Sequence, residues 1–147
     1  MTPDVNVLLA ALRADHPQHQ VARRWLEDAL TEAASGASFT LMPVVVASML
    51  RLATSPRIFQ VPTPIDAAVG FIDALVASSG VTMAQQGPEW PVLRRLCMDK
   101  RLGGNDLPDA WLAASTLHLG EHLVSFDRDF RKLLGRAHFT LLSSTTG

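Results

Sequence analysis

At three separate places in this sequence, acidic side chains stand where an apolar segment begins or ends. Asp4 precedes the run VNVLLAALR, Asp106 and Asp109 open the segment NDLPDAWLAASTLHLG, and Asp127 follows the run HLVSF. Asp106 and Asp109 are three residues apart, so a helix places both carboxylates on one side of its first turn. Carboxylates that share a pocket repel one another, and a divalent cation relieves that repulsion.

Oxygen ligands of this kind suit Mg²⁺ and Mn²⁺, which can activate water and offset negative charge on a phosphodiester. The set Asp4, Asp106, Asp109 and Asp127 therefore indicates metal-dependent phosphodiester hydrolysis. Taken singly, each acid is equally well explained as a helix cap or as a favourable charge at a helix N-terminus. Asp129 is expected to be a solvated or capping residue. Only the joint arrangement favours a metal site.

The acids can meet only if the chain folds as alternating strands and helices. Apolar spacing, prolines and glycines predict helices over residues 5–13, 16–30, 44–54, 65–80, 88–104 and 105–120. Short apolar runs predict strands over residues 39–41, 81–84, 122–126 and 138–142. Three prolines mark 55–64 as a connector, and 127–134 reads as a turn or short helix. This order predicts an α/β sandwich around a short parallel sheet, where functional groups gather beyond the carboxyl ends of the strands.

Size and composition fit one globular domain over residues 1–147. Cys97 is the only cysteine, which excludes an internal disulfide and suits a reducing compartment. The formal net charge is −1, so binding to nucleic acid must be local. No apolar stretch approaches membrane-spanning length and the first residues do not resemble a signal peptide, so a soluble, cytoplasmic protein is expected.

Four segments in this order resemble the VapC-type toxins of the PIN-domain ribonuclease family: DVNVLLAALRADHP, RLATSPRIF, GNDLPDAWLAA and VSFDRDF. The likeness runs almost end to end. It implies a PIN-like three-layer α/β/α sandwich with a short parallel central sheet. It also implies a Mg²⁺- or Mn²⁺-dependent endoribonuclease that cuts structured RNA, is inhibited by a VapB-type antitoxin and usually forms a homodimer.

The resemblance places the family's first, third and fourth acids on Asp4, Asp109 and Asp127. Asn6 and Ser125 match the polar residues that support these acids, and Asp106 matches an extra acid found in some members. The family's second acid is missing, because Ser48 stands at that position and no acid occurs from residue 33 to 65. Our hypothesis is that Asp106 replaces it, with the Ser48 hydroxyl in support. Only Met1, Thr2 and Pro3 precede Asp4, and Pro3 has no N–H to donate to a ladder. The expectation is either a stunted first strand or a natural start that lies upstream.

Because this centre is acidic, RNA must be held by flanking cations. The candidates for phosphate contacts are Arg51, Arg57, Arg94, Arg95 and Arg128, although for each one taken singly a solvated surface charge is the simpler explanation. Trp25, Trp90 and Trp111 lie at apolar positions of helices and are expected in the core rather than as platforms for bases.

Two other functions remain open from the sequence. Ser48 is compatible with a catalytically silent PIN-like domain that acts only by binding. Acids at strand ends also suit a Mg²⁺-dependent phosphoacceptor module of the receiver type, although such a module needs a lysine at a strand end, and Lys100 and Lys132 both lie in helical surroundings.

Overall fold

The computed structural model describes residues 1–143. Along this range the helices are α1 (Val5–Leu12), α2 (His19–Ala34), α3 (Pro43–Ala53), α4 (Ile65–Ala77), α5 (Trp90–Lys100), α6 (Asp106–His118) and the 3₁₀ helix η1 (Arg128–Lys132). The strands are β1 (Thr2–Pro3), β2 (Phe39–Leu41), β3 (Val81–Met83), β4 (Leu123–Ser125) and β5 (Phe139–Leu141). The α/β class and the order of elements agree with the prediction from the sequence.

The strands form parallel ladders in the orders β1-β4-β5 and β2-β3. The Thr40 N–H donates to the Met1 carbonyl at 3.0 Å and joins β2 to the first ladder. On the other side of β1, Thr2 and Asp4 donate to β4, so the nitrogen of Pro3 faces β2. Proline has no N–H to donate, so Met1 rather than Pro3 makes the backbone bonds toward β2, and its amino group also donates to the Ser38 carbonyl at 2.7 Å.

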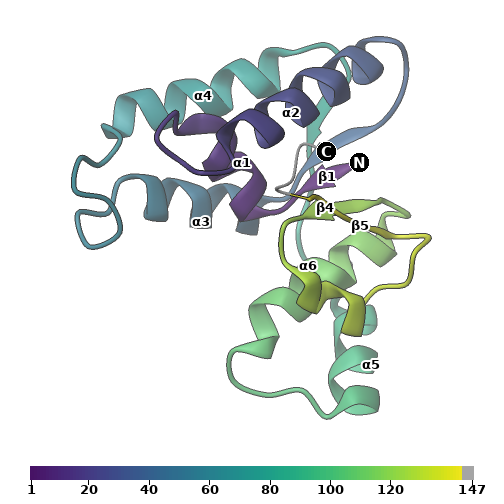
Figure 1. The fold of residues 1–147 in the computed structure, drawn as a ribbon. Coiled ribbons are helices and arrows are strands. Elements are labelled where there is room, and N and C mark those ends of the chain that lie inside the picture. Colours follow the sequence, from purple (N-terminus) through teal and green to yellow (C-terminus); the bar gives the residue numbers. More distant parts are fainter. Residues whose placement is uncertain (144–147) are drawn as a thin grey trace.

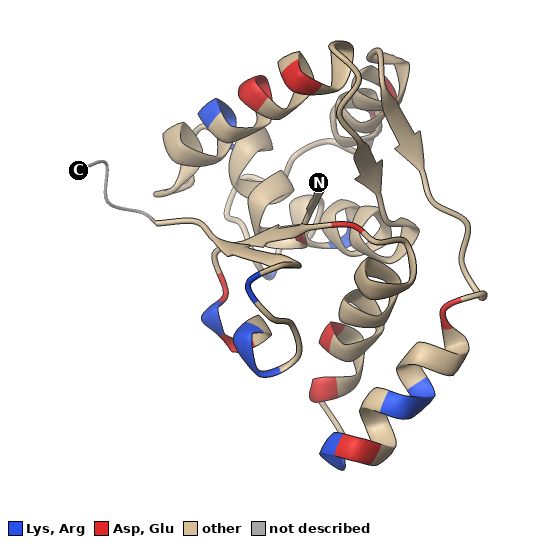
Figure 2. Cartoon of the chain, turned by 90° about the vertical axis from the view of Figure 1, so that its right-hand side faces the viewer, with Lys and Arg blue, Asp and Glu red and all other residues tan. Residues whose placement is uncertain are grey.

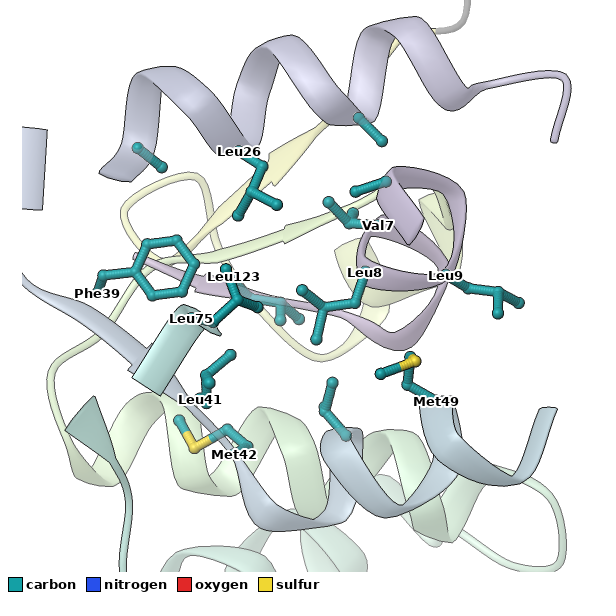
Figure 3. Packing of buried hydrophobic residues seen from close by; sticks show 14 of the residues in the cluster. Val7, Leu8, Leu9, Leu26, Phe39, Leu41, Met42, Met49, Leu75 and Leu123 are labelled. Atoms are coloured by element: carbon teal, nitrogen blue, oxygen red, sulfur yellow. The ribbon is translucent and has the colours of Figure 1, made fainter. Parts of the chain in front are cut away.

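Figure 1 shows α1 to α4 gathered on one side of the strands and α5 and α6 on the other. The main core forms where α1 packs against α2, α3 and β4. In Figure 3, Leu8 of α1, Leu26 of α2 and Met49 of α3 point toward the strand residues Phe39, Leu41 and Leu123. A smaller cluster around Leu93, Ala110 and Ala114 joins α5 to α6.

Helix boundaries differ from the sequence-based prediction mainly at α2 and α5. The α2 helix begins three residues later than predicted and continues to Ala34, just before Gly36, which has a φ of 108°. The α5 helix ends at Lys100 because Arg101 adopts a left-handed conformation, with φ 51°, and its N–H donates to the Cys97 carbonyl. None of the helices within residues 1–143 combines the length and the apolar character needed to cross a bilayer.

Candidate functional site

Asp4 lies where β1 passes into α1 and has only 7% of its surface exposed. Its Oδ1 accepts the Val5 N–H at 2.7 Å, and its Oδ2 accepts the Ser125 hydroxyl at 2.7 Å. Asp4 is therefore both the N-cap of α1 and a contact to the carboxyl end of β4. These two bonds reduce the cost of burying a charged group.

Ser125 is the centre of a hydrogen-bond network that joins three segments. Its Oγ donates to Asp4 and accepts from Asn6 Nδ2 at 3.1 Å and from the Asp127 N–H at 2.9 Å. Asn6 Oδ1 also accepts the Phe126 N–H at 3.2 Å. The network fixes the turn after β4 against the first turn of α1, and so sets the position of Asp127 relative to Asp4.

Asp109 projects from the first turn of α6 and is half-buried. Burial, followed by repulsion from Asp4, Asp127, Asp129 and Asp106, raises its pKa to about 6. The pKa of Asp4 is raised as well, chiefly by burial and to a lesser degree by Asp127, against the effect of the bonds from Ser125 and Val5. The acids predicted from separate segments are thus close enough to disfavour one another's negative charge.

Two small cavities open beside Asp109. The first, about 60 Å³, is lined by Asp4, Val5, Val44, Val45, Ser48, Pro108, Asp109 and Leu112. The second, about 90 Å³, is lined by Leu102, Asp106, Asp109, Asp129, Lys132 and Leu133. Ser48 consequently lies beside Asp4 and Asp109, whereas Asp106 lies on the far side of Asp109, toward η1.

Asp127 and Asp129 have different local roles. Asp127 Oδ1 accepts the Asp129 N–H at 2.9 Å and caps η1, while Asp129 is exposed and lies 3.8 Å from the ammonium of Lys132. This pairing agrees with the expectation that Asp129 is solvated or capping. Asp127 combines a capping role with proximity to Asp4 and Asp109.

The donor set suits a hard divalent cation. Within residues 1–143 no three His, Cys, Asp or Glu side chains are already arranged as a metal site. However, Asp4 and Asp109 line one cavity, and Asp127 lies close enough to act on the pKa of both. Mg²⁺ and Mn²⁺ prefer carboxylate oxygens, so the residues fit the expected ion.

Residues 106–129 contain the acids Asp106, Asp109, Glu121, Asp127 and Asp129, and one of them does not belong to this site. Glu121 precedes β4, at the opposite end of that strand, and is buried. Its Oε1 accepts the Thr40 hydroxyl at 2.7 Å and its Oε2 lies 2.8 Å from the Met1 nitrogen. Glu121 therefore stabilises the amino ends of the strands rather than the cluster of carboxylates.

The five predicted RNA-binding arginines are all exposed, but they lie in different places. Arg128 directly follows Asp127, and Arg94 and Arg95 lie on α5. Arg51 is in the last turn of α3 and Arg57 is in the connector beyond it. Figure 2 shows the acidic first turn of α6 between basic residues of η1 on one side and of α5 on the other.

The expectation that all three tryptophans are in the core was wrong for two of them. Trp25 packs against Phe39 with ring centroids 6.0 Å apart, but Trp90 is 55% exposed and Trp111 is 40% exposed. The Trp111 indole N–H donates to the buried Glu89 at 2.6 Å, which gives that ring a polar anchor at the surface. Helical spacing identifies a side chain's direction from its own helix, but not whether another helix covers it.

Glu89 is a buried acid that the sequence did not single out. Its other oxygen accepts the Gly87 N–H at 2.9 Å, and these bonds lower its pKa although burial opposes the shift. The Glu89 carboxylate therefore links the start of α5 to Trp111 of α6, which is two residues beyond Asp109. Its only signal in the sequence is its place before a predicted helix, where an acid is ordinary.

Comparison with known proteins agrees with this geometry. The family model of the PIN domain matches residues 1–134. Ribonuclease VapC31 of Mycobacterium tuberculosis is 41% identical over 138 residues, which cover 92% of this chain and 94% of that protein. Ribonuclease VapC25 of the same organism is 40% identical over 136 residues, with the same coverage of 92% and 94%.

Among solved structures, the VapBC2 complex from Rickettsia felis, bound to a DNA fragment from its promoter, contains a similar chain. The TM-score is 0.63, and the match covers 97% of this chain and 98% of the other at 13% identity, so this likeness concerns the fold alone. The family model, the two curated relatives and the shared fold agree. The chain therefore belongs to the PIN domain family, among its VapC-type members.

Proposed function

We propose that this protein is a VapC-type toxin that cleaves RNA by divalent-metal-dependent hydrolysis of phosphodiester bonds. The observation that carries the proposal is that Asp4 and Asp109 line one cavity and that Asp127 lies close enough to act on the pKa of both. Support also comes from relatives named ribonucleases that match over more than nine-tenths of the chain.

Asp4, Asp109 and Asp127 are the proposed ligands for Mg²⁺ or Mn²⁺. When bound, such an ion supplies activation of water and neutralisation of phosphate charge. Ser125 and Asn6 hold Asp4 and the Asp127 backbone in position. With these contacts fixed before substrate binds, little reorganisation is needed during the reaction.

The proposal also gives roles to Asp106 and Ser48 beside the three ligands. Asp106 is near enough to contribute to the raised pKa of Asp109, and Ser48 shares a cavity with Asp4 and Asp109. We retain the hypothesis that Asp106 takes over the missing acid's role, with Ser48 in support. Unchanged Mn²⁺-dependent cleavage by Asp106→Asn would show that Asp106 has no such role.

A fluorogenic RNA assay tests the main proposal. Cleavage by the wild-type protein should require Mg²⁺ or Mn²⁺ and stop with EDTA, and Asp109→Asn should reduce the rate by at least about 100-fold. Asp28→Asn, an exposed acid on α2, is the control for the loss of one charge and should cleave normally. Equal cleavage with EDTA would contradict metal dependence.

The second candidate function is a silent PIN-like domain that only binds. It is favoured by Ser48, which leaves the cavity beside Asp4 without the acid found in many members of the family. RNA binding by the wild-type protein without cleavage at any Mn²⁺ concentration would support this alternative. The receiver-type alternative loses its basis, because Lys100 and Lys132 lie on α5 and η1 rather than at strand ends.

A VapB-type antitoxin is the proposed protein partner. We infer that a Lys or Arg of this partner could enter the acidic pocket and take the place of the cation. Added Mn²⁺ should then weaken inhibition in the cleavage assay, and inhibition that is independent of Mn²⁺ would count against this mechanism. We also propose a homodimer, which analytical ultracentrifugation of the isolated protein would reveal directly.

A further inference from the structure

A second cavity, separate from the acidic pocket, lies between η1 and β5. Its volume is about 440 Å³, and it is lined by Arg131, Leu134, Gly135, Arg136, Phe139 and Leu141. This volume lies within the range of about 300–1,000 Å³ that is usual for pockets that bind small molecules. Its lining contains two basic side chains and no acid, in contrast to the cavities around Asp109.

Both guanidinium groups of this cavity are available to a ligand. Arg131 and Arg136 are exposed, and within residues 1–143 neither side chain has an ion pair or a hydrogen bond. The neighbouring Lys132 already pairs with Asp129. Free guanidinium groups bind phosphate oxygens through paired N–H donors, so the expected ligand is a phosphate or another anion.

The other walls of the cavity are suited to the rest of a nucleotide. Leu141 is half-buried and provides an apolar side chain beside the two arginines, while Leu134 and Phe139 close the cavity from the core with only 4% and 8% of their surfaces exposed. β5 is the last strand of its ladder, and its backbone bonds to β4 involve His138 and Leu142. Because donors and acceptors alternate along a parallel strand, the N–H and C=O groups of Phe139 and Leu141 face away from β4. These groups can bind the polar edge of a base.

The position of the cavity connects it to the carboxylates. Asp127 caps η1, and Arg131 follows four residues later in the same 3₁₀ helix. An RNA strand with a phosphate near Asp127 therefore has a cationic surface next to it along η1. Figure 2 shows that basic residues of η1 lie beside the acidic turn of α6.

We propose that this cavity is a subsite for one nucleotide of the RNA, next to the bond that is cleaved. Arg131 and Arg136 bind its phosphate, and the base lies against Leu141 and the free edge of β5. The inference rests on the proposed ribonuclease function and adds a place where the substrate is held. An acidic peptide is the less favoured ligand, since β5 has only three residues with which to pair a peptide strand.

The test measures RNA binding without cleavage. Fluorescein-labelled single-stranded RNA is titrated with protein in EDTA, and anisotropy gives the Kd at several salt concentrations. The variant Arg131→Gln/Arg136→Gln should weaken binding at least about 10-fold at low salt. The slope of log K against log salt should fall by roughly 0.7, because the two arginines bind one phosphate and each phosphate contact on a single strand contributes about 0.7.

Arg23→Gln/Arg24→Gln is the matched control. It removes the same charge from α2, where Arg23 pairs only with the exposed Glu27 within its own helix. Binding by this control should stay within about threefold of the wild type. Circular dichroism melts should show that both double variants fold, because all four side chains are exposed.

The outcomes separate the two proposals. If the wild type binds RNA and the Arg131/Arg136 variant binds equally well, the subsite is wrong and the ribonuclease proposal stands. If the wild type neither binds nor cleaves RNA, both fail. If a labelled hexaglutamate peptide binds the wild type and not the variant, while RNA binding is unchanged, the cavity is a peptide site and the nucleotide assignment is overturned.

Discussion

Asp4 illustrates how single contacts decide whether an acid can be buried at this site. The carboxylate is 7% exposed, yet one oxygen accepts the Val5 N–H and the other accepts the Ser125 hydroxyl. Both bonds stabilise the ionised form, while burial and Asp127 oppose it. Asn6 and Asp127 depend on the same hydroxyl for their positions. Ser125 therefore affects three groups although it carries no charge itself.

Ser125→Ala should lower the free energy of unfolding by about 1–3 kcal/mol, because Asp4 and the Asp127 N–H lose a buried partner. Urea denaturation at neutral pH measures the change. Ser35→Ala is the control, since that hydroxyl is at the exposed end of α2 and makes one long bond of 3.4 Å. A stability equal to that of the wild type would mean that water replaces the Ser125 contacts at no cost.

At the level of elements, local signals in the sequence predicted most helices and strands. The segment 105–120 has Asn105, Asp106 and Pro108 at its start and Gly120 after its end, and α6 occupies Asp106–His118. The stunted β1 follows from Pro3. What local signals could not supply is contact between elements, such as the bond from Trp111 of α6 to Glu89 beside α5.

Gly80, the residue before β3, lies close to Ala33 of α2. This contact gives a prediction for Gly80, with Gly70 of α4 as the comparison. Gly80 has a φ of 81°, and a Cβ there would overlap the carbonyl group of Ala33. Gly80→Ala should therefore lower the free energy of unfolding by more than about 2 kcal/mol. Gly70→Ala, in α4 with no atom near its would-be Cβ, should raise stability by up to about 1 kcal/mol.

Urea denaturation of both variants tests this prediction, and the opposite signs make it specific. If Gly80→Ala is as stable as the wild type, the approach of Ala33 to Gly80 is looser than the structure has it. Gly70→Ala also checks that alanine is tolerated in this part of the chain.

The contact between Glu89 and Trp111, which links α5 to α6, gives a second prediction at the level of elements. Glu89→Gln keeps one acceptor oxygen and places an NH₂ group against the N–H of Gly87 or Trp111. The variant should lose about 1–3 kcal/mol of unfolding free energy, and tryptophan fluorescence should change as Trp111 is released. Glu27→Gln, an exposed acid on α2, should change stability by less than about 1 kcal/mol. No change in either signal for Glu89→Gln would remove the assigned role of this carboxylate.

At the scale of the whole molecule, folding brings together carboxylates from residues 4, 109 and 127, and this has a cost that depends on pH. Asp109 has an ordinary pKa of 3.8 and a pKa of about 6 in the folded protein. The folded state therefore holds its proton more tightly than the unfolded state between these values. In the absence of metal, the contribution of Asp109 to the free energy of unfolding therefore falls as the pH rises from 3.8 to about 6.

Asp109→Asn removes this dependence. In EDTA the variant should be more stable than the wild type at about pH 7.5, by about 1–2 kcal/mol after allowance for partial exposure, and the difference should shrink at about pH 4. Urea denaturation at a series of pH values measures both curves. A difference that does not vary with pH would show that burial and repulsion do not raise the pKa of Asp109 in solution.

The sequence by itself determined the α/β order, most helix starts and strand ends to within three residues, and which acids lie at those ends. These properties depend on residues close together along the chain, through caps, prolines, glycines and apolar spacing. The tertiary structure decided that Glu121 binds Thr40 and Met1, that Trp90 and Trp111 are exposed, and that Arg131 and Arg136 face one cavity. Burial and electrostatic repulsion depend on which distant segments become neighbours, and that is set by packing of the whole chain.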